Sequence, residues 1–422
     1  MPLGRLLPGR PTPDRPTPDR PTPDRPLPGH SPGDRAPEDG PPGGRPSGRP
    51  SPWRRAALRA PSGRPARVAA ALLLLAAAAV PLALVADRAP GPQAADPAVS
   101  ADGLPSSDGP DLTAVPDHDV PFGAFLGSWE DGVRSIGPLA QWLHGADVRV
   151  GHTYLAGNDW SDIEGDTPAL ALWSRWRQAE PDRMLVLNVP LQAGNEDGAG
   201  DDEVRDLIHR GADGEFDGHF LTLARRLVDL GAGDTVLVLG WEMNGTTYNH
   251  RCGPDPEAWR AYWRRVVGVM RSVPGQRFRF DFAPSRGLDA VPWTHCYPGD
   301  DVVDVIGMDS YDQDPGDTFD DYVAQPYGLR RQVEFAAAHR KPVSYPEWGL
   351  FRHGDDPEFV RRMVGWIRTH DTLYQTATDY CPHGFWQCGE NPRSSEVYRE
   401  LLSARPGASA AAPPEASPGP RP

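Results

Sequence analysis

Two glutamates stand where short apolar runs of the chain end, and aromatic residues flank both. Glu242 lies in the sequence Trp-Glu-Met-Asn-Gly after an apolar run, and Glu347 lies in Ser-Tyr-Pro-Glu-Trp-Gly. A single glutamate is most often a surface or helix-capping side chain, but two at the ends of expected strands form a more specific pattern. Facing carboxylates in an aromatic cleft suit glycosidic cleavage, in which one protonates the leaving oxygen and the other attacks or activates water. The sequence therefore predicts Glu242 and Glu347 as a catalytic pair.

Strand-like segments alternate with helical patterns through the second half of the chain. They are expected at 121–129, 147–154, 183–190, 235–242, 277–284, 302–311, 341–348 and 372–380. The third and fourth are nearly all apolar, as parallel strands buried on both faces should be. Eight β/α units predict an α/β fold of the (β/α)8 TIM barrel type, with the active site at the carboxyl ends of the strands. The fourth and seventh strands lie across the barrel mouth, so the two glutamates would face each other.

The clearest helix is expected to begin after Asp255, which is suited to cap it, with Pro256 in its first turn. Its apolar residues fall on one stripe: Trp259, Tyr262, Trp263, Val266, Val267 and Met270. The same spacing recurs in 359–367 before the last strand. These stripes predict helices packed on the barrel, so Trp259 and Trp263 are interpreted as core residues.

The two glutamate motifs resemble those of clan A glycoside hydrolases, and most closely family 26, which contains β-mannanases and related endo-acting enzymes. The resemblance spans roughly residues 120–403 and implies Glu242 as the acid/base, Glu347 as the nucleophile and retention of anomeric configuration. Asp309-Ser310-Tyr311 is similar to the motif that ends the family's sixth strand. By this resemblance, Tyr311 hydrogen-bonds the nucleophile and Trp386 is the platform for the sugar at the cleavage point.

Two positions depart from the family pattern. Trp241 stands where family 26 mannanases commonly have histidine before the acid/base, and Thr246-Thr247-Tyr248 stands where they commonly have tryptophan. Both positions line the sugar cleft in the family. The substrate therefore stays open between mannan and another β-linked glycan, such as a β-glucan or xylan.

Residues near the expected strand ends are candidate glycan contacts, because sugar C–H faces stack on aromatic rings. The candidates are Trp241, Asn244, Asp309, Tyr311, Trp386, Trp129, His152 and Trp348. Two interpretations of His152 are equally favoured. It is either a contact to the sugar or to a residue that touches the sugar, or a histidine of the core. The histidines show no metal-ligand spacing, so neither a metal nor a cofactor is expected.

Charge and composition divide the chain into two unlike parts. The net charge of −15 argues against nucleic acid as a partner. Residues 1–67 nevertheless hold 13 arginines against six acidic residues, and Arg-Pro-Thr-Pro-Asp repeats three times from Arg10 to Asp24. Proline at this density predicts a disordered, extended tail.

An uncharged stretch of 19 residues, 68–86, follows five nearby arginines. It is barely long enough to span a membrane, and the positive-inside rule places the N-terminus in the cytoplasm and the rest outside. Two interpretations stay open: an uncleaved signal anchor, or a secretory signal cut near Ala86. Either way we expect a linker at 87–117, an exported glycan-acting domain at 118–405, which is membrane-attached or secreted, and a disordered end at 406–422.

Four cysteines, all beyond the apolar stretch, are expected to form disulfides in an exported compartment. Four cysteines allow three pairings. Cys252 and Cys296 lie in loops after adjacent strands, and Cys381 and Cys388 bracket one short loop. This placement favours the pairs 252–296 and 381–388 over a zinc site, because the spacings do not suit zinc.

Two functions are compatible with these features. The favoured one is a monomeric retaining glycoside hydrolase acting on a β-linked polysaccharide or oligosaccharide. The alternative is a cell-surface barrel that binds glycan without cleaving it. The presence of both glutamates favours the enzyme.

Overall fold

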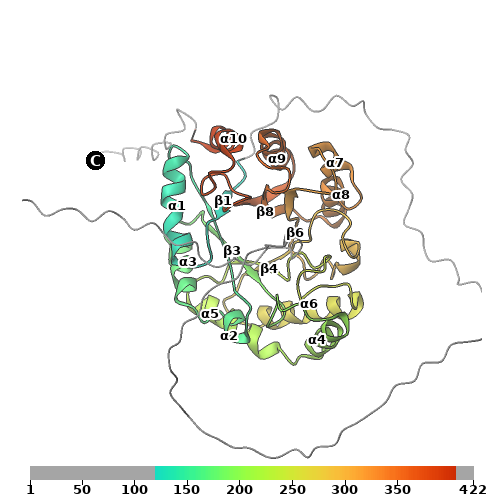
Figure 1. Cartoon of the computed structure of the whole chain (residues 1–422). Coiled ribbons are helices and arrows are strands. Elements are labelled where there is room, and N and C mark those ends of the chain that lie inside the picture. Colours follow the sequence, from blue (N-terminus) through green and yellow to red (C-terminus); the bar gives the residue numbers. More distant parts are fainter. Residues whose placement is uncertain (1–118, 405–422) are drawn as a thin grey trace, which may run out of the picture. The chain divides into compact units, whose positions relative to one another are not determined.

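The computed structural model describes residues 119–404, which form a closed barrel of parallel strands surrounded by helices (Figure 1). The predicted tail, apolar stretch and linker before this range, and the predicted C-terminal end, lie outside the described residues. The strands are β1 (Phe122–Phe125), β2 (Val150–Tyr154), β3 (Met184–Val189), β4 (Val236–Leu239), β5 (Arg279–Phe282), β6 (Val305–Gly307), β7 (Ser310–Asp312), β8 (Val343–Leu350) and β9 (Thr372–Thr378). Each overlaps a predicted strand.

All pairings between neighbouring strands are parallel, in the order β6-β5-β4-β3-β2-β1-β9-β8-β7. A further pairing of β6 with β8 closes the ring, with Ile306 opposite Val343. The short β7 continues the path of β6 and also pairs with β8, so the two together occupy one position of the barrel. The barrel therefore has eight strand positions, as the sequence predicts.

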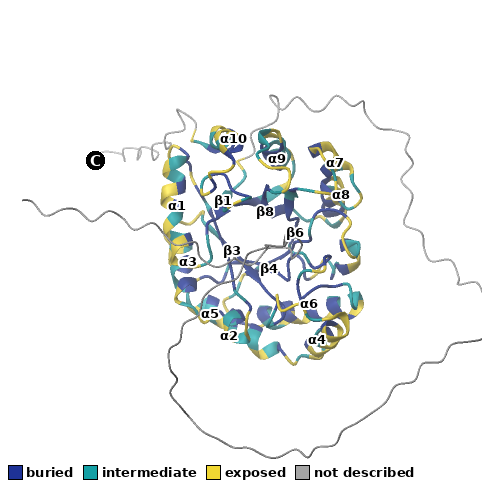
Figure 2. Cartoon of the chain, in the orientation of Figure 1, coloured by how far each residue is buried: buried dark blue, intermediate teal, exposed yellow. Residues whose placement is uncertain are grey.

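The helices lie around the barrel, with buried residues towards the strands and exposed residues outwards (Figure 2). They are α1 (Glu130–Trp142), α2 (Trp160–Ile163), α3 (Pro168–Gln178), α4 (Asp201–Asp213), α5 (Asp217–Asp229), α6 (Pro256–Arg271), α7 (Phe319–Ala324), α8 (Leu329–His339), α9 (Pro357–Thr369) and α10 (Pro392–Leu402). One unit departs from the predicted repeat. Only a 3-10 helix, η1 (Trp293–Cys296), follows β5. Pro284, Pro292 and Pro298 interrupt this segment, and proline removes the backbone donors that a longer helix needs.

Helix α6 forms where the sequence predicts it. The Asp255 side chain accepts a hydrogen bond from the backbone N–H of Ala258, and Pro256 occupies the first turn, where a helix needs no donor. Trp259 and Trp263 are fully buried on its inner face. Burial of this apolar stripe, rather than helix propensity alone, holds α6 on the barrel.

Alternate residues of the strands face opposite sides of the barrel wall. On β4, Leu237 and Leu239 pack in the large core between strands and helices, whereas Val236 and Val238 join a separate cluster. That second cluster also holds Tyr154 and Trp241, and it fills the barrel interior. Side chains that share the interior face at the carboxyl ends of the strands are therefore the ones able to meet at the mouth.

Both favoured disulfides are present. Cys252 bonds Cys296, joining the segment after β4 to η1, and Cys381 bonds Cys388. Both Cys252 and Cys296 are fully buried. Within residues 119–404, no helix is long and apolar enough to cross a membrane.

Candidate active site

Glu242 lies just beyond β4, in a turn that its own backbone conformation helps to define. Its φ of 51° falls in the left-handed region, which is uncommon for residues other than glycine. Its backbone N–H donates to the carbonyl of Ala283 after β5, at 2.8 Å. A non-glycine residue held in this region costs free energy and is typical of functional sites, because the surrounding structure must enforce it.

Glu347 lies within β8, which extends further than predicted, to Leu350. The register of β8 against β9 is irregular between Tyr345 and Trp348. Tyr345 and Trp348 both pack in the outer core, although regular alternation would put them on opposite faces. The irregularity between them leaves Glu347 on the interior face, since a bulge changes the direction of a strand's side chains.

The Glu347 carboxylate receives several donors. Tyr311 Oη donates to Oε2 at 2.7 Å, and Asn188 Nδ2 donates to Oε1 at 3.3 Å. The Tyr154 hydroxyl is a third hydrogen-bond partner. Burial raises the pKa of Glu347, and these three donors lower it because they stabilise the charged form. The hydrogen bond of Tyr311 is the one that the family resemblance implies.

A second layer of residues orients Asn188. Because Asn188 donates to Glu347, its Oδ1 is free to accept from His152 Nε2, at 3.0 Å. His152 is fully buried, and its Nδ1 lies 3.0 Å from Thr376 Oγ1. Burial lowers the pKa of His152 to about 4, so the ring is neutral at physiological pH. His152 therefore positions the site through Asn188 and does not present its ring to a sugar.

Glu242 has a different environment from Glu347. Burial is the largest cause that raises its pKa, and the charge of Glu347 raises it further, to about 8. Asp289 also raises the pKa, whereas a hydrogen bond with the Ser285 side chain lowers it. The charge of Glu347 thus acts on the Glu242 carboxyl group, so the two carboxyl groups interact electrostatically. The environment of Glu242 therefore favours its protonated form. The three hydrogen-bond donors around Glu347 favour its ionised form.

Asp309 lies buried beside the pair. Among the described residues, no side chain hydrogen-bonds its carboxyl oxygens, and the backbone of Glu347 is the one group that lowers its pKa by a hydrogen bond. Burial, and then the charges of Glu347 and Glu242, raise the pKa of Asp309 well above its usual range. Asp309 is 2% exposed, so it has almost no surface for direct sugar contact. The expectation that it binds substrate directly is not supported by its position.

Aromatic rings surround the mouth. The Trp241 ring packs edge-on against Tyr154, Tyr248 and His250, with centroids 5.5, 5.1 and 4.9 Å away. Trp241 is only 2% exposed, so it acts mainly as packing beneath Glu242. Trp129 is the opposite case. It is 55% exposed and lines a small pocket together with Tyr154, so its ring is available for stacking.

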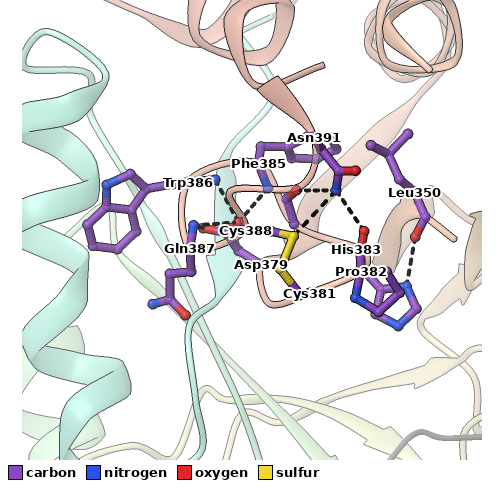
Figure 3. Close-up of a disulfide and its surroundings, with 11 residues drawn as sticks. Leu350, Asp379, Cys381, Pro382, His383, Phe385, Trp386, Gln387, Cys388 and Asn391 are labelled. Carbon is purple, nitrogen blue, oxygen red and sulfur yellow. Dashed lines mark hydrogen bonds between the residues drawn. A yellow bond between two sulfur atoms is a disulfide. The ribbon is translucent and has the colours of Figure 1, made fainter. Parts of the chain in front are cut away.

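Trp386 lies in the loop closed by the Cys381–Cys388 disulfide. The Asp379 carboxylate accepts the backbone N–H groups of Phe385, Trp386 and Gln387. Figure 3 shows the indole of Trp386 extending away from the disulfide and from Asp379. The buried Asp379 carboxylate thus holds the backbone of the loop, and the Trp386 side chain on this loop is partly exposed.

Two candidate sugar contacts were wrong. Trp348 is fully buried, donates through Nε1 to Gln375 Oε1 at 2.6 Å and packs on Phe385. Adjacent strand residues point to opposite faces, so the neighbour of Glu347 faces the helices. Asn244 is also fully buried, and its side-chain amide exchanges two hydrogen bonds with the backbone of Ser285. Asn244 therefore joins the loops after β4 and β5 and does not contact substrate.

Asn188, Tyr154 and Tyr380 are further site residues that were not predicted from the sequence. Asn188 is the one polar residue of β3, MLVLNV, and a polar residue in a strand buried on both faces is a usable signal. Tyr154 ends β2 on the same face as His152. Tyr380 follows β9, and burial and then the charges of Glu347 and Glu242 raise its pKa, so it interacts with the pair.

Residues 239–340 match the sequence model of glycosyl hydrolase family 26. Over this segment the barrel is similar to family 26 catalytic domains. The matched segment runs from the end of β4 to just beyond α8 and includes Glu242, Asp309 and Tyr311. This similarity supports a glycoside hydrolase that acts on O-glycosyl bonds. No curated protein matches the chain at a significant level.

Solved structures of endo-β-1,4-mannanases share the fold. An endo-β-1,4-mannanase double mutant of Cellulomonas fimi is 17% identical, with a TM-score of 0.52, covering 67% of this chain and 70% of that one. The catalytic domain of a family 26 endo-β-1,4-mannanase from Bacillus sp. JAMB-750 is 17% identical, with a TM-score of 0.50, covering 68% of this chain and 87% of that one. At this identity the likeness concerns the fold.

Proposed function

We propose that this domain is a family 26 retaining β-glycanase that uses Glu242 as acid/base and Glu347 as nucleophile. The observation that carries the proposal is the contrast between the two carboxyl groups. Tyr311, Asn188 and Tyr154 hydrogen-bond Glu347, whereas the pKa of Glu242 is raised by burial and by the charge of Glu347. A nucleophile must be ionised and an acid must carry a proton, and these environments favour those states.

The reaction follows in two steps. Glu347 Oε1 or Oε2 attacks the anomeric carbon while Glu242 donates its proton to the departing glycosidic oxygen. This step breaks the glycosidic bond and leaves a glycosyl ester on Glu347. Glu242, now ionised, accepts a proton from water, and the resulting hydroxide attacks the anomeric carbon and releases Glu347. Two inversions give net retention, which requires carboxyl groups about 5–5.5 Å apart.

Hydrogen bonds to Glu347 act in both steps. The Tyr311 donor keeps Glu347 ionised before attack, and it also stabilises the carboxylate as it leaves the glycosyl ester. Asn188, oriented by the neutral His152, has the same role on the other oxygen. The protein therefore supplies preorganised donors, which do not need to reorient during the reaction.

We propose a mannan-type β-1,4-linked polysaccharide as the substrate, because two solved structures of similar fold are described as endo-β-1,4-mannanases. Trp241, which is buried, stands before Glu242 where family 26 mannanases commonly have histidine. The competing substrates to test are therefore β-glucan and xylan. The decisive experiment is hydrolysis of mannan, barley β-glucan and xylan by the purified full chain, followed by product sizing. Mannan cleavage at least tenfold faster than the others supports the proposal. A glycan bound without any product release would favour a non-catalytic glycan-binding barrel.

We also propose that the domain acts outside the cell. The basis is the uncharged segment 68–86 preceded by arginines, together with two disulfides in the described domain.

A further inference from the structure

The proposed reaction leaves one buried carboxyl group of the barrel interior without a role. Asp281 lies on β5 and is fully buried. Its two neighbours in the strand are phenylalanines that pack in the outer core, so the Asp281 side chain faces the interior. Asp281 Oδ2 accepts hydrogen bonds from Ser344 Oγ of β8 at 2.6 Å and from the Tyr374 hydroxyl of β9 at 2.7 Å. We propose that Asp281 is a positioning residue for the nucleophile, acting through these two donors on the part of β8 that carries Glu347.

The two donors are paired across β8 and β9 at a place where the strand register is irregular. Ser344 lies opposite Tyr374. The register shifts just before this pair and again between Tyr345 and Trp348. Regular backbone pairing therefore does not by itself hold this part of β8 against β9. Glu347 lies within the second irregular stretch, so its position depends on how the pair before it is held. A single carboxylate that bonds both side chains of the pair provides that attachment.

Strand β6 lies between β5 and β8 and leaves room for this bridge. The residue of β6 at the crossing point is Gly307. A Cβ atom there would lie 2.6 Å from Asp281 Oδ1 and 3.0 Å from Ser344 Oγ. A side chain at this position would therefore push apart two groups that are hydrogen-bonded to each other. Because Gly307 has none, the carboxylate of β5 reaches across β6 to β8 and β9.

The surroundings of Asp281 strengthen both hydrogen bonds. Burial raises the pKa of Asp281 to about 6. The hydrogen bonds from Ser344 and Tyr374 lower the pKa, as does the charge of Arg279. Asp281 is therefore largely ionised at neutral pH, and hydrogen bonds to an ionised acceptor are about twice as strong as those between neutral groups. The charge of Asp281 also contributes to the raised pKa of Asp309, which lies beside the catalytic pair.

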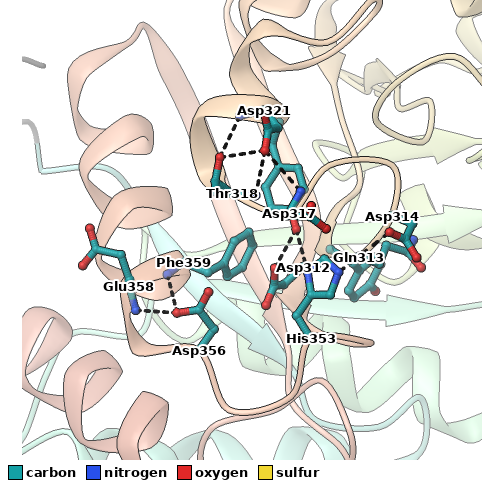
Figure 4. A network of polar contacts seen from close by, with 12 residues as sticks. Asp312, Gln313, Asp314, Asp317, Thr318, Asp321, His353, Asp356, Glu358 and Phe359 are labelled. Atoms are coloured by element: carbon teal, nitrogen blue, oxygen red, sulfur yellow. Dashed lines mark hydrogen bonds and ion pairs between the residues drawn. The ribbon is translucent and has the colours of Figure 1, made fainter. Parts of the chain in front are cut away.

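A second network holds the chain beyond the nucleophile. His353 follows β8, and its Nδ1 lies 3.1 Å from Oδ1 of Asp312, which ends β7 (Figure 4). The Tyr322 hydroxyl donates to the same oxygen at 2.7 Å. His353 Nε2 also lies 3.9 Å from Asp314 Oδ1. The His353 side chain is 26% exposed, whereas Asp281 and both of its donors are fully buried. The interior network is therefore the more rigid of the two attachments of β8.

The test compares two fully buried tyrosines whose hydroxyl groups have different partners. Tyr374 donates to Asp281 in the interior, whereas the Tyr345 hydroxyl accepts from Trp366 Nε1 on the outer side of β8. Y374F and Y345F each remove one buried hydrogen bond, so both variants of the full chain should have a lower Tm. Only Y374F should lower kcat on the glycan that the wild-type chain cleaves. The expected fall is about tenfold, because a small displacement of a reacting group slows the reaction. KM should change by less than about twofold.

A measurement without glycan separates this inference from the proposed function, on which it rests. Carbon NMR of the side-chain carboxyl group, assigned with E347Q, follows the pKa of Glu347 directly. In Y374F this pKa should be higher than in the wild type, because a displaced Glu347 loses its donors Tyr311 and Asn188. In Y345F it should be unchanged.

The outcomes decide between a positioning role and a purely structural one. An equal fall of kcat in Y374F and Y345F would overturn the inference, and so would an unchanged pKa of Glu347 in Y374F. S344A removes the other donor to Asp281 and should reproduce the effects of Y374F, so it replaces that variant if Y374F does not fold. If the wild-type chain cleaves no glycan, the proposed function fails, and the pKa of Glu347 alone decides the role of Asp281.

Discussion

The hydroxyl of Tyr311 donates a 2.7 Å hydrogen bond to Oε2 of Glu347 and also lies 2.7 Å from Thr378 Oγ1. The two residues come from neighbouring strands, β7 and β8. Because the hydroxyl proton goes to the carboxylate, Thr378 is left to donate its own proton to Tyr311. The result is a short chain of hydrogen bonds that ends on Glu347 and favours its ionised form.

Replacing Tyr311 with Phe should slow the reaction without unfolding the protein. A hydrogen bond to a charged group contributes about 1.5–3 kcal/mol, so kcat/KM should fall by about 10- to 150-fold. The pKa of Glu347 should rise, which moves the acidic limb of the pH profile to higher pH. Tyr297→Phe is the control, since that hydroxyl donates to Asp300 next to α8. An unchanged acidic limb in Tyr311→Phe would argue against this role.

The two glutamates should respond differently to substitution. Glu347→Gln should abolish turnover on every substrate. Glu242→Gln should lower kcat on a polysaccharide by about 10²–10⁴-fold but still form the glycosyl-enzyme from an activated aryl glycoside. Azide should rescue Glu242→Ala by giving a glycosyl azide of retained configuration, because azide needs no base. Proton NMR of the products checks the stereochemistry. Inverted product from the wild-type enzyme would falsify the two-step mechanism.

Activity should show a bell-shaped dependence on pH. Glu242 must be protonated, so activity falls as pH rises through its raised pKa, about 8. Glu347 must be ionised, so activity falls as pH drops through its pKa, which is raised from 4.5. Because the groups interact, the two limbs report the pair. Asp289→Asn removes a negative charge that raises the pKa of Glu242, so the basic limb should move to lower pH. A basic limb that stays in place would show that Asp289 does not act on Glu242.

The two disulfides should differ in their contribution to stability. Cys252 and Cys296 are 44 residues apart, and Cys381 and Cys388 are 7 apart. On the chain-entropy model, the larger loop contributes about 4 kcal/mol and the smaller about 2–3 kcal/mol. Denaturant unfolding of the two double Cys→Ser variants should therefore show the greater loss for Cys252 and Cys296. Free thiols at both positions in exported protein, detected by nonreducing peptide mapping, would contradict the bond itself.

The location of the domain can be tested in cells. If residues 68–86 cross the membrane with the arginines inside, protease added to intact cells should remove the barrel and spare 1–67. If the segment is a cleaved signal, the barrel should appear in the medium and begin near residue 87. A barrel that is protected in intact cells and digested only after lysis would exclude both arrangements.

The sequence by itself determined the eight strands, helix α6 and the positions of Glu242 and Glu347. These features depend on local patterns: apolar runs bounded by polar residues, a 3.6-residue stripe with Asp255 as its cap, and carboxylates at strand ends. The barrel topology follows from parallel strands alternating with helices. These patterns involve residues that are close together in the sequence, so they can be identified without the tertiary structure.

Only the tertiary structure decided which side chains meet Glu347. Asn188 and Tyr154 come from β3 and β2, and their contact depends on the register and on which face each strand turns inward. The irregularity in β8 reverses the alternation, so Glu347 faces the mouth while Trp348, its neighbour, is buried against the helices. A register shift of one residue exchanges the two faces of a strand, and no local sequence pattern predicts such a shift. The same holds for His353 and Asp314, which lie on separate loops and become neighbours only when the barrel closes.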